Sequence, residues 1–204
     1  MKFLDKITAK PWEHAGEMEG VHGEFVVTRS AGQMGLWLFL AVVSSLFLLF
    51  IVSYYTRSQF PDWEKIADPG ILWVNTALLI FASVALQIAS NAARRDAAGT
   101  MRNALVAGGL LTMAFVAGQL MAWEQLMSAG FYAQDNPATA FFYLVTGLHA
   151  LHLLGGLWFM AILGVRLNRQ NQRVKALQSV ALCATYWHYL LLVWLILFTL
   201  LLRT

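Results

Sequence analysis

Three histidines in the C-terminal half of the chain carry the side chains best suited to chemistry. His149 and His152 are three residues apart, so a helix would place them on roughly one face, and His188 follows in the next apolar segment. Neutral imidazole ligates iron, copper and zinc, so haem or metal ligation is one interpretation of this set. The three histidines have no clear carboxylate partner, and we favour the alternative, in which they are hydrogen-bonded residues that link helices.

Four further polar side chains interrupt the long apolar segments: Asn75, Gln87, Gln119 and Glu124. Polar groups are expensive in hydrocarbon, so each of them is informative. Glu124 lies near the end of its segment, where it is either part of a proton relay or an interfacial carboxylate hydrogen-bonded to a neighbouring helix. A single carboxylate near one surface cannot form a pathway across a membrane, so we expect the second. No apolar segment holds the acid, base and nucleophile that hydrolytic or transfer chemistry needs.

Two weaker candidates remain outside this set. A polar tail, residues 1–31, contains four possible cation ligands, which are His14, Glu17, His22 and Glu24. We expect this tail to be solvated, and it lacks the apolar run of a cleavable signal peptide. The single cysteine, Cys183, excludes an internal disulfide and a multi-thiolate metal site, and a small packing residue is the simplest interpretation of it.

The composition indicates which elements must hold these residues. Of 204 residues, 59% are hydrophobic and 12% charged, against about 25% charged residues in soluble domains. Five apolar runs are each long enough to cross a bilayer as a helix. They span residues 32–55, 71–91, 104–127, 139–165 and 180–202. The sequence therefore predicts an all-α, polytopic membrane helix bundle of five transmembrane helices over residues 32–204, after the tail.

The basic residues predict the orientation of this bundle. With five spans, only Arg57, Lys65 and Arg203 fall on the side of the C-terminus, and the other eleven of the 14 Lys and Arg residues fall on the side of the tail. The positive-inside rule then places the N-terminus inside, in the cytoplasm, and the C-terminus outside. Because the positive charge is explained in this way, the net charge of +3 does not indicate nucleic acid binding.

Small residues and aromatic residues fit the same arrangement. Ala114, Gly118 and Ala122 recur every four residues, and Gly147, Gly155 and Gly156 follow in the next segment, so we expect close helix packing there. Aromatic side chains near the predicted ends of the spans are expected to be interfacial anchors. They are Tyr54, Tyr55, Trp63, Trp73 and Trp123.

Two motifs in the last two segments resemble a known family. Residues 141–152, FFYLVTGLHALH, are similar to the F-[FY]-x-x-T-G-x-H-[GA]-x-H signature of cytochrome oxidase subunit III, and residues 186–194, YWHYLLLVW, to its last-helix motif Y-W-H-F-V-D-V-V-W. Weaker similarities occur in residues 35–40, 73–76, 118–119 and 123–124, so all five segments match in order. The resemblance is to the five-helix bacterial form, which lacks the first two helices of the seven-helix form.

The resemblance implies a non-catalytic subunit of a haem-copper terminal oxidase in the bacterial inner membrane. Such a subunit holds no haem or copper, which are expected in the partner catalytic subunit I, and it packs against subunit I, with subunit II in the same complex. It binds phospholipid in a cleft between helices and supports proton uptake during turnover. The electron donor, cytochrome c or quinol, and the haem type are properties of other chains.

The residues expected to serve lipid binding and helix packing fall in two groups. The first lies within the helices and consists of Phe142, Gly147, His149, His152, Gly155, Trp187 and His188. Grooves between helices are expected to be lined by the aromatic and small residues around Phe141, Phe142, Tyr143, Gly147, Gly155 and Trp187. The second would offer positive charge to phosphate headgroups at the cytoplasmic surface. It consists of Arg94, Arg95, Arg166 and Arg169.

Two departures from the family pattern keep other functions open. Val43 stands where the family usually has a glutamate, and Leu191 where the last motif has its aspartate, so any role of those carboxylates cannot be carried over. A subunit-III-like accessory protein of a nitric oxide reductase system is therefore an alternative. An enzyme or electron carrier with haem ligated by His149, His152 or His188 is a second alternative. A small transporter is a third, although the paired repeats expected of one are absent from the sequence.

Overall fold

The structure, a computed structural model, describes residues 31–63, 70–134, 136–167 and 173–203. Nearly all of this part of the chain is helical. The helices are α2 (Ala31–Arg57), α3 (Ile71–Arg94), α4 (Ala98–Ser128), α5 (Pro137–Leu167) and α6 (Arg173–Arg203). All five are long and apolar enough to cross a membrane, which confirms the predicted all-α, five-helix fold. The tail with its cation-binding candidates lies outside the described residues, as does Arg169.

Two helices begin earlier than the apolar runs that predicted them. α4 begins at Ala98 and not near residue 104, and α6 begins at Arg173 and not near residue 180. Hydropathy marks only the part of a helix that fits the hydrocarbon, whereas backbone hydrogen bonding continues through polar residues such as Arg102 and Asn103 into the interface.

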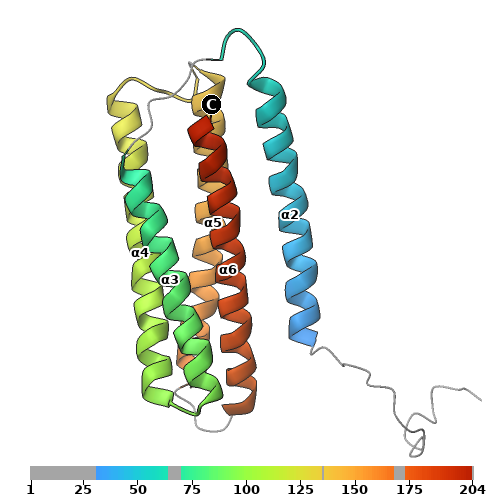
Figure 1. The fold of residues 1–204 in the computed structure, drawn as a ribbon, viewed down its shortest axis with the longest axis vertical. Coiled ribbons are helices and arrows are strands. Elements are labelled where there is room, and N and C mark those ends of the chain that lie inside the picture. The colour runs from blue at the N-terminus through green and yellow to red at the C-terminus, as the bar shows by residue number, and fades with distance from the viewer. Residues whose placement is uncertain (1–30, 64–69, 135, 168–172, 204) are drawn as a thin grey trace, which may run out of the picture. The chain divides into compact units, whose positions relative to one another are not determined.

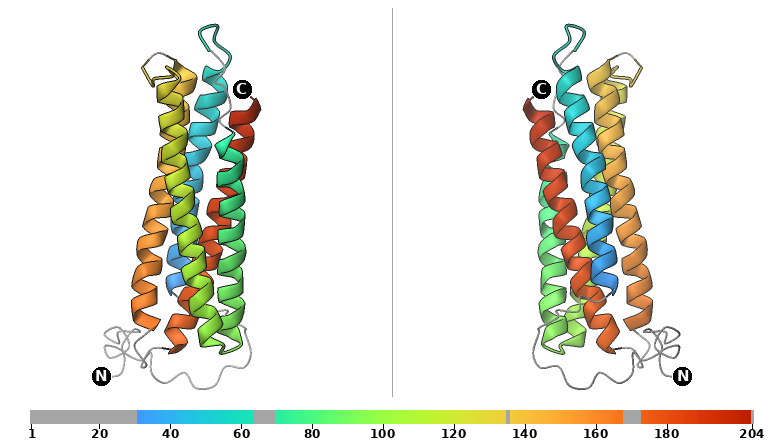
Figure 2. Two further views of the ribbon diagram at one scale, coloured as in Figure 1. Left: turned by 90° about the vertical axis from the view of Figure 1, so that its left-hand side faces the viewer. Right: turned by 90° about the vertical axis from the view of Figure 1, so that its right-hand side faces the viewer.

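The helices run up and down in sequence order (Figure 1). α3 and α4 form an antiparallel pair with the most extensive contacts in the bundle, and α6 packs against α2, α3 and α5. α2 contacts only α5 and α6 among the described elements, so it stands at the edge of the bundle (Figures 1 and 2). Ala31 and Arg203 lie at opposite ends of the bundle, as an odd number of crossings requires. The inside-to-outside orientation remains a prediction from the basic residues.

A tight turn joins α3 to α4. The backbone N–H of Ala97 donates to the carbonyl of Ala92 and that of Asp96 to the carbonyl of Ala93, which satisfies carbonyls left open at the helix end. Asp96 has φ +54°, a left-handed conformation that a short polar side chain tolerates. The turn brings the two helices together with few residues between them.

Small side chains let α3 approach α4 and α6 closely. Ala82, Ala89 and Ala93 of α3 are buried, and a Cβ added to Gly108 of α4 would come within 2.9 Å of Leu86. In the expected stripe on α4, Gly118 and Ala122 are buried but Ala114 is exposed. Residues spaced by four drift around a helix with 3.6 residues per turn, so one end of such a stripe, here Ala114, lies outside the contact.

α2 is attached by a few large side chains. Of its 27 residues, only Leu40, Val43, Phe47 and Tyr54 are buried. Val43 and Phe47 pack in a cluster with Val145 of α5 and Val193 of α6. The rest of α2 presents large apolar side chains such as Leu38 and Leu49 to the outside, which suits contact with lipid.

Candidate functional site

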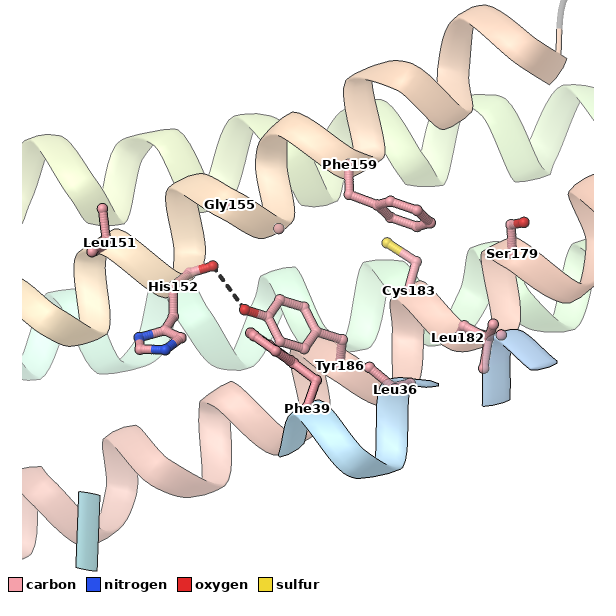
Figure 3. A pocket seen from close by; sticks show the side chains of 12 residues that line it. Leu36, Phe39, Leu151, His152, Gly155, Phe159, Ser179, Leu182, Cys183 and Tyr186 are labelled. Atoms are coloured by element: carbon pink, nitrogen blue, oxygen red, sulfur yellow. Dashed lines mark hydrogen bonds between the residues drawn. The ribbon is translucent and has the colours of Figure 1, made fainter. Parts of the chain in front are cut away.

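A cavity of about 680 Å³ lies between α2, α5 and α6. Leu36 and Phe39 line it from α2, and His152, Gly155 and Phe159 line it from α5 (Figure 3). An added Cβ on Gly155 would meet no atom within 4 Å, so the missing side chain leaves part of this space open. The cavity therefore lies where α2, which has few buried side chains, leaves part of the surface of α5 and α6 uncovered.

α6 supplies the third wall of the cavity through Ser179, Leu182, Cys183 and Tyr186. The Tyr186 hydroxyl donates to the backbone carbonyl of His152 at 2.9 Å (Figure 3). The remaining surface is almost entirely apolar carbon. A cavity of this size and lining suits an apolar chain.

The neighbouring glycine, Gly156, has the opposite environment. It is buried, and an added Cβ would come within 2.7 Å of the Tyr186 ring and 2.9 Å of the Trp187 ring. Of the two adjacent glycines, Gly156 thus permits the contact of α5 with α6, and Gly155 faces the cavity. Gly147, further along α5, lies against the Trp123 ring.

His152 stands at one end of the cavity and bonds within its own helix. Its Nδ1 is 2.7 Å from the Leu148 carbonyl, so Nδ1 carries the proton and donates. Its ring packs against Phe47 and Phe39, with centroids 5.5 and 6.3 Å apart. The expected hydrogen bond from His152 to another helix is therefore wrong for its side chain, although its carbonyl receives the Tyr186 bond.

His149 is fully buried in an aromatic shell. Its ring lies 5.2 Å from Trp194, 5.9 Å from Phe115 and 6.5 Å from Phe47 between centroids. Neither ring nitrogen has a hydrogen-bond partner among the described residues. The prediction of a hydrogen-bonded link is wrong here as well, because aromatic side chains from α2, α4 and α6 fill every side of the ring.

His188 does link two helices. Its Nδ1 lies 2.5 Å from the Ser83 hydroxyl, and its Nε2 lies 2.9 Å from Oε1 of Gln87, both on α3. This confirms the expected link for the third histidine. No group of three or more His, Cys, Asp or Glu side chains that could hold a metal ion occurs in the part of the chain that the structure describes.

Three tryptophan–threonine pairs, two of them buried and one part-buried, join the helices, and none of them was predicted from the sequence. Trp187 donates to Thr112 at 2.9 Å, Trp194 to Thr76 at 2.9 Å, and Trp123 to Thr146 at 3.1 Å. Each threonine hydroxyl donates to the carbonyl four residues earlier in its own helix, so its oxygen is left to accept the indole N–H. Buried indoles need such an acceptor, and this rule is the signal that could have found the pairs.

The remaining polar candidates have separate surroundings. The Asn75 amide donates to Gln119 Oε1 at 3.4 Å, between α3 and α4, and a Cβ on Gly118 would overlap the Asn75 side chain. Glu124 is exposed, and no described side chain bonds to it, so its expected hydrogen bond to a neighbouring helix is wrong. It points outward because its position on α4 lies away from the interior side chains Ala122 and Leu126.

The other predicted residues divide between the core and one end of the bundle. Phe142 and Trp187 are buried in the core and do not line the cavity. Arg94, Arg95 and Arg166 are exposed near the ends of α3 and α5, at the end of the bundle where α2 begins.

The two positions without the family's carboxylates are packed in apolar surroundings. Val43 is 4% exposed among side chains of α5 and α6, and Leu191 packs against the cluster of buried residues that includes Leu190 and Trp194.

Comparison with known proteins covers nearly the whole chain. The family model described as cytochrome c oxidase subunit III matches residues 8–203. The chain is 25% identical over 169 residues to subunit 3 of the cytochrome bo(3) ubiquinol oxidase of Pseudomonas aeruginosa, covering 81% of each chain. It is 28% identical over 201 residues to cytochrome c oxidase subunit 3 of Thermostichus vulcanus, covering 95% of this chain and 92% of that one. The chain therefore belongs to the cytochrome c oxidase subunit III family.

Proposed function

We propose that this chain is the non-catalytic subunit III of a haem-copper terminal oxidase in the bacterial inner membrane. The observation that carries the proposal is the family match over residues 8–203, which includes all five helices. In this assignment the chain packs against catalytic subunit I, beside subunit II, and the haem and copper belong to those partners. The chain contributes packing and lipid retention.

The cavity between α2, α5 and α6 is the proposed site of a phospholipid acyl chain. It is lined from Gly32 near the start of α2, Phe159 towards the end of α5 and Ser179 towards the start of α6, which all lie in the same half of the bundle. Arg166 is exposed at that end and offers a positive charge for a headgroup phosphate. A bound chain would fill apolar surface that α2 leaves uncovered.

Filling the cavity tests lipid binding without disturbing the helix contacts. Gly155→Leu places a side chain in open space inside the cavity, and Gly164→Leu is the matched control, because Gly164 is exposed on the same helix and also has no neighbour within 4 Å. We expect Gly155→Leu to reduce the phospholipid that copurifies with the delipidated complex, measured by native mass spectrometry. Equal lipid content in the two variants would contradict the site.

The proposed contribution to proton uptake rests on shape and not on titration inside this chain. Val43 and Leu191 occupy the positions of the family's acids, so support for proton entry would come from retained lipid and covered surface of subunit I. Oxidase without this chain should start at a substantial rate and lose activity over successive turnovers. Activity measured against turnover number, with and without the chain, tests this, and identical curves with unchanged proton pumping would refute it.

The missing acids also favour a second candidate, a subunit-III-like accessory protein of a nitric oxide reductase system. A tagged form of the chain, purified from the native membrane, distinguishes the two. Copurified oxygen reductase activity supports the oxidase assignment, whereas copurified nitric oxide reductase activity supports the second candidate.

A further inference from the structure

A line of polar side chains runs from the contact between α3 and α6 onto the surface of these two helices. Ser83, Gln87 and Asn91 follow one another at four-residue spacing on one side of α3, and His188 of α6 lies beside them. We call these four residues the polar strip. It includes no residue of the cavity between α2, α5 and α6, and the lipid site proposed above does not use it.

The hydrogen bonds of the polar strip run in one direction. The Ser83 hydroxyl donates to Nδ1 of His188, because the other ring nitrogen, Nε2, donates to the amide oxygen of Gln87 at 2.9 Å. The amide nitrogen of Gln87 donates to Oδ1 of Asn91 at 3.1 Å. The series ends on the Asn91 amide nitrogen, whose two N–H groups have no partner among the described residues. The strip therefore offers donors and needs an acceptor.

Three of the four residues of the strip are exposed within an apolar surface, and Ser83 is buried beneath them. Gln87, Asn91 and His188 are exposed, and the exposed residues beside them on the same helices are Val84, Ile88 and Leu192. At about 1.5 Å per residue, Gln87 is about 11 Å from the end of α3 at Arg94, which is well inside the hydrocarbon. Polar groups at this depth normally face protein or a cavity and not lipid tails.

We propose that the polar strip is the docking surface for a transmembrane helix of another subunit, one that presents side-chain oxygen acceptors to Asn91 and Gln87. The inference rests on the proposed function, because it requires a complex of several membrane subunits. A helix fits better than a lipid headgroup, since Gln87 and His188 lie deeper than phosphate and the strip itself carries no Lys or Arg to attract one. Helix packing also removes the exposed amides from hydrocarbon.

Site-specific photocrosslinking in the intact complex tests the proposal. A benzophenone side chain at Ile88, which is 48% exposed beside the strip, leaves all four polar residues in place. The control probe is at Val106 of α4, which is 56% exposed and about as deep. We expect the probe at Ile88 to form a product with another subunit. The double substitution Gln87→Leu with Asn91→Leu should reduce that product about three- to tenfold, as expected for losing two intramembrane hydrogen bonds.

Thr199→Val is the matched control for these substitutions, because Thr199 is exposed on α6 and bonds only within its own helix. It should leave the Ile88 product unchanged. Any of four results would overturn the inference. The probe at Ile88 could form no product or crosslink only to lipid. Its yield could be no higher than that at Val106, or its product could be unaffected by the double substitution. If oxidase subunits still copurify with the chain in those cases, the docking surface is refuted and the proposed function is retained. If no oxidase subunit copurifies, the docking surface and the proposed function are both refuted.

Discussion

The two sides of α6 show two ways of joining helices in this bundle. Towards α3, small residues bring the backbones close, and Trp194 bonds to Thr76 across that contact, while the longer reach of Trp187 carries its indole to Thr112 of α4. Towards α2, large side chains hold the helix at a few points and leave a cavity of about 680 Å³. The close contact of α6 with α3 leaves no room for a ligand. The contact of α6 with α2, which is made at a few points, leaves a cavity that has room for one.

The α2 side is nevertheless held by specific contacts. The hydroxyls of Ser44 and Tyr189 lie 2.8 Å apart between α2 and α6. At the far end of α2, Tyr54 packs edge-on against Trp63 and Phe141, with ring centroids 4.9 and 5.7 Å apart. These contacts hold the middle and the far end of α2 and leave the cavity open near its start, so substitutions can be aimed at each side separately.

The largest effect on stability should come from a glycine in the close contact between α4 and α3, away from the α2 side of the bundle. Gly118→Leu would drive a side chain into Asn75 of α3, and overpacking of this kind costs about 1–3 kcal/mol or more. Gly155→Leu enters open space and should change stability by less than about 0.5 kcal/mol. The measurement is the temperature at which this subunit is lost from the detergent-solubilised complex. Equal losses for the two variants would mean that both interfaces are packed alike.

Breaking a tryptophan–threonine pair should give the next largest loss of stability. Thr112→Val keeps the shape of the side chain but leaves the indole N–H of Trp187 unpaired in the core, at a cost of about 1–2 kcal/mol. Adding Trp187→Phe to Thr112→Val should cost less than the sum of the two single changes, because the unpaired donor is then gone. Thr199→Val, exposed on the same bundle, is the control. The same thermal measurement applies, and additive effects would show that the bond contributes nothing.

The sequence predicted the five helices but not the difference between the two sides of α6. Apolar length and basic loops are local properties, so the helices near 71–91 and 139–165 were found almost to their ends. Packing is not local. Gly155 and Gly156 are identical in type and adjacent, yet one faces a cavity and the other permits a helix contact.

The histidines show the same limit. Their spacing indicated that His149 and His152 share a face, but three residues on a helix still differ by about 60° in direction. That difference places His149 among aromatic rings and His152 at the cavity. The partners of His188, Ser83 and Gln87, lie about a hundred residues earlier, and nothing in the spacing of either motif predicts that pairing.

Replacing His188 or His149 by phenylalanine tests the difference between a hydrogen-bonded and a packed histidine, and the expected change in stability is smaller than for the tryptophan–threonine pair. His188→Phe loses bonds to Ser83 and Gln87 and should destabilise the subunit by about 0.5–1 kcal/mol. His149→Phe replaces a ring without partners by one of similar size in an aromatic shell, so its effect should be within about 0.5 kcal/mol. The visible spectrum of the purified complex is the second measurement. Loss of haem absorbance in His149→Phe would show that this residue is a ligand and not a packing residue.

The smallest effect should be at the loop after α2, where Arg57 bonds to Asp62 across an exposed turn. The guanidinium of Arg57 holds the pKa of Asp62 below its ordinary value of 3.8, chiefly through the hydrogen bond between them. A depressed carboxylate pKa means that the pair contributes fully above the ordinary pKa and is lost as the pH falls through the lowered value. We expect the carboxyl carbon-13 resonance of Asp62 to titrate below pH 3.8, and Arg57→Gln to move its midpoint up towards that value. Because the pair is exposed, added salt should produce part of the same upward shift in the unsubstituted chain. A midpoint unchanged by Arg57→Gln would show that Arg57 is not what lowers the pKa of Asp62.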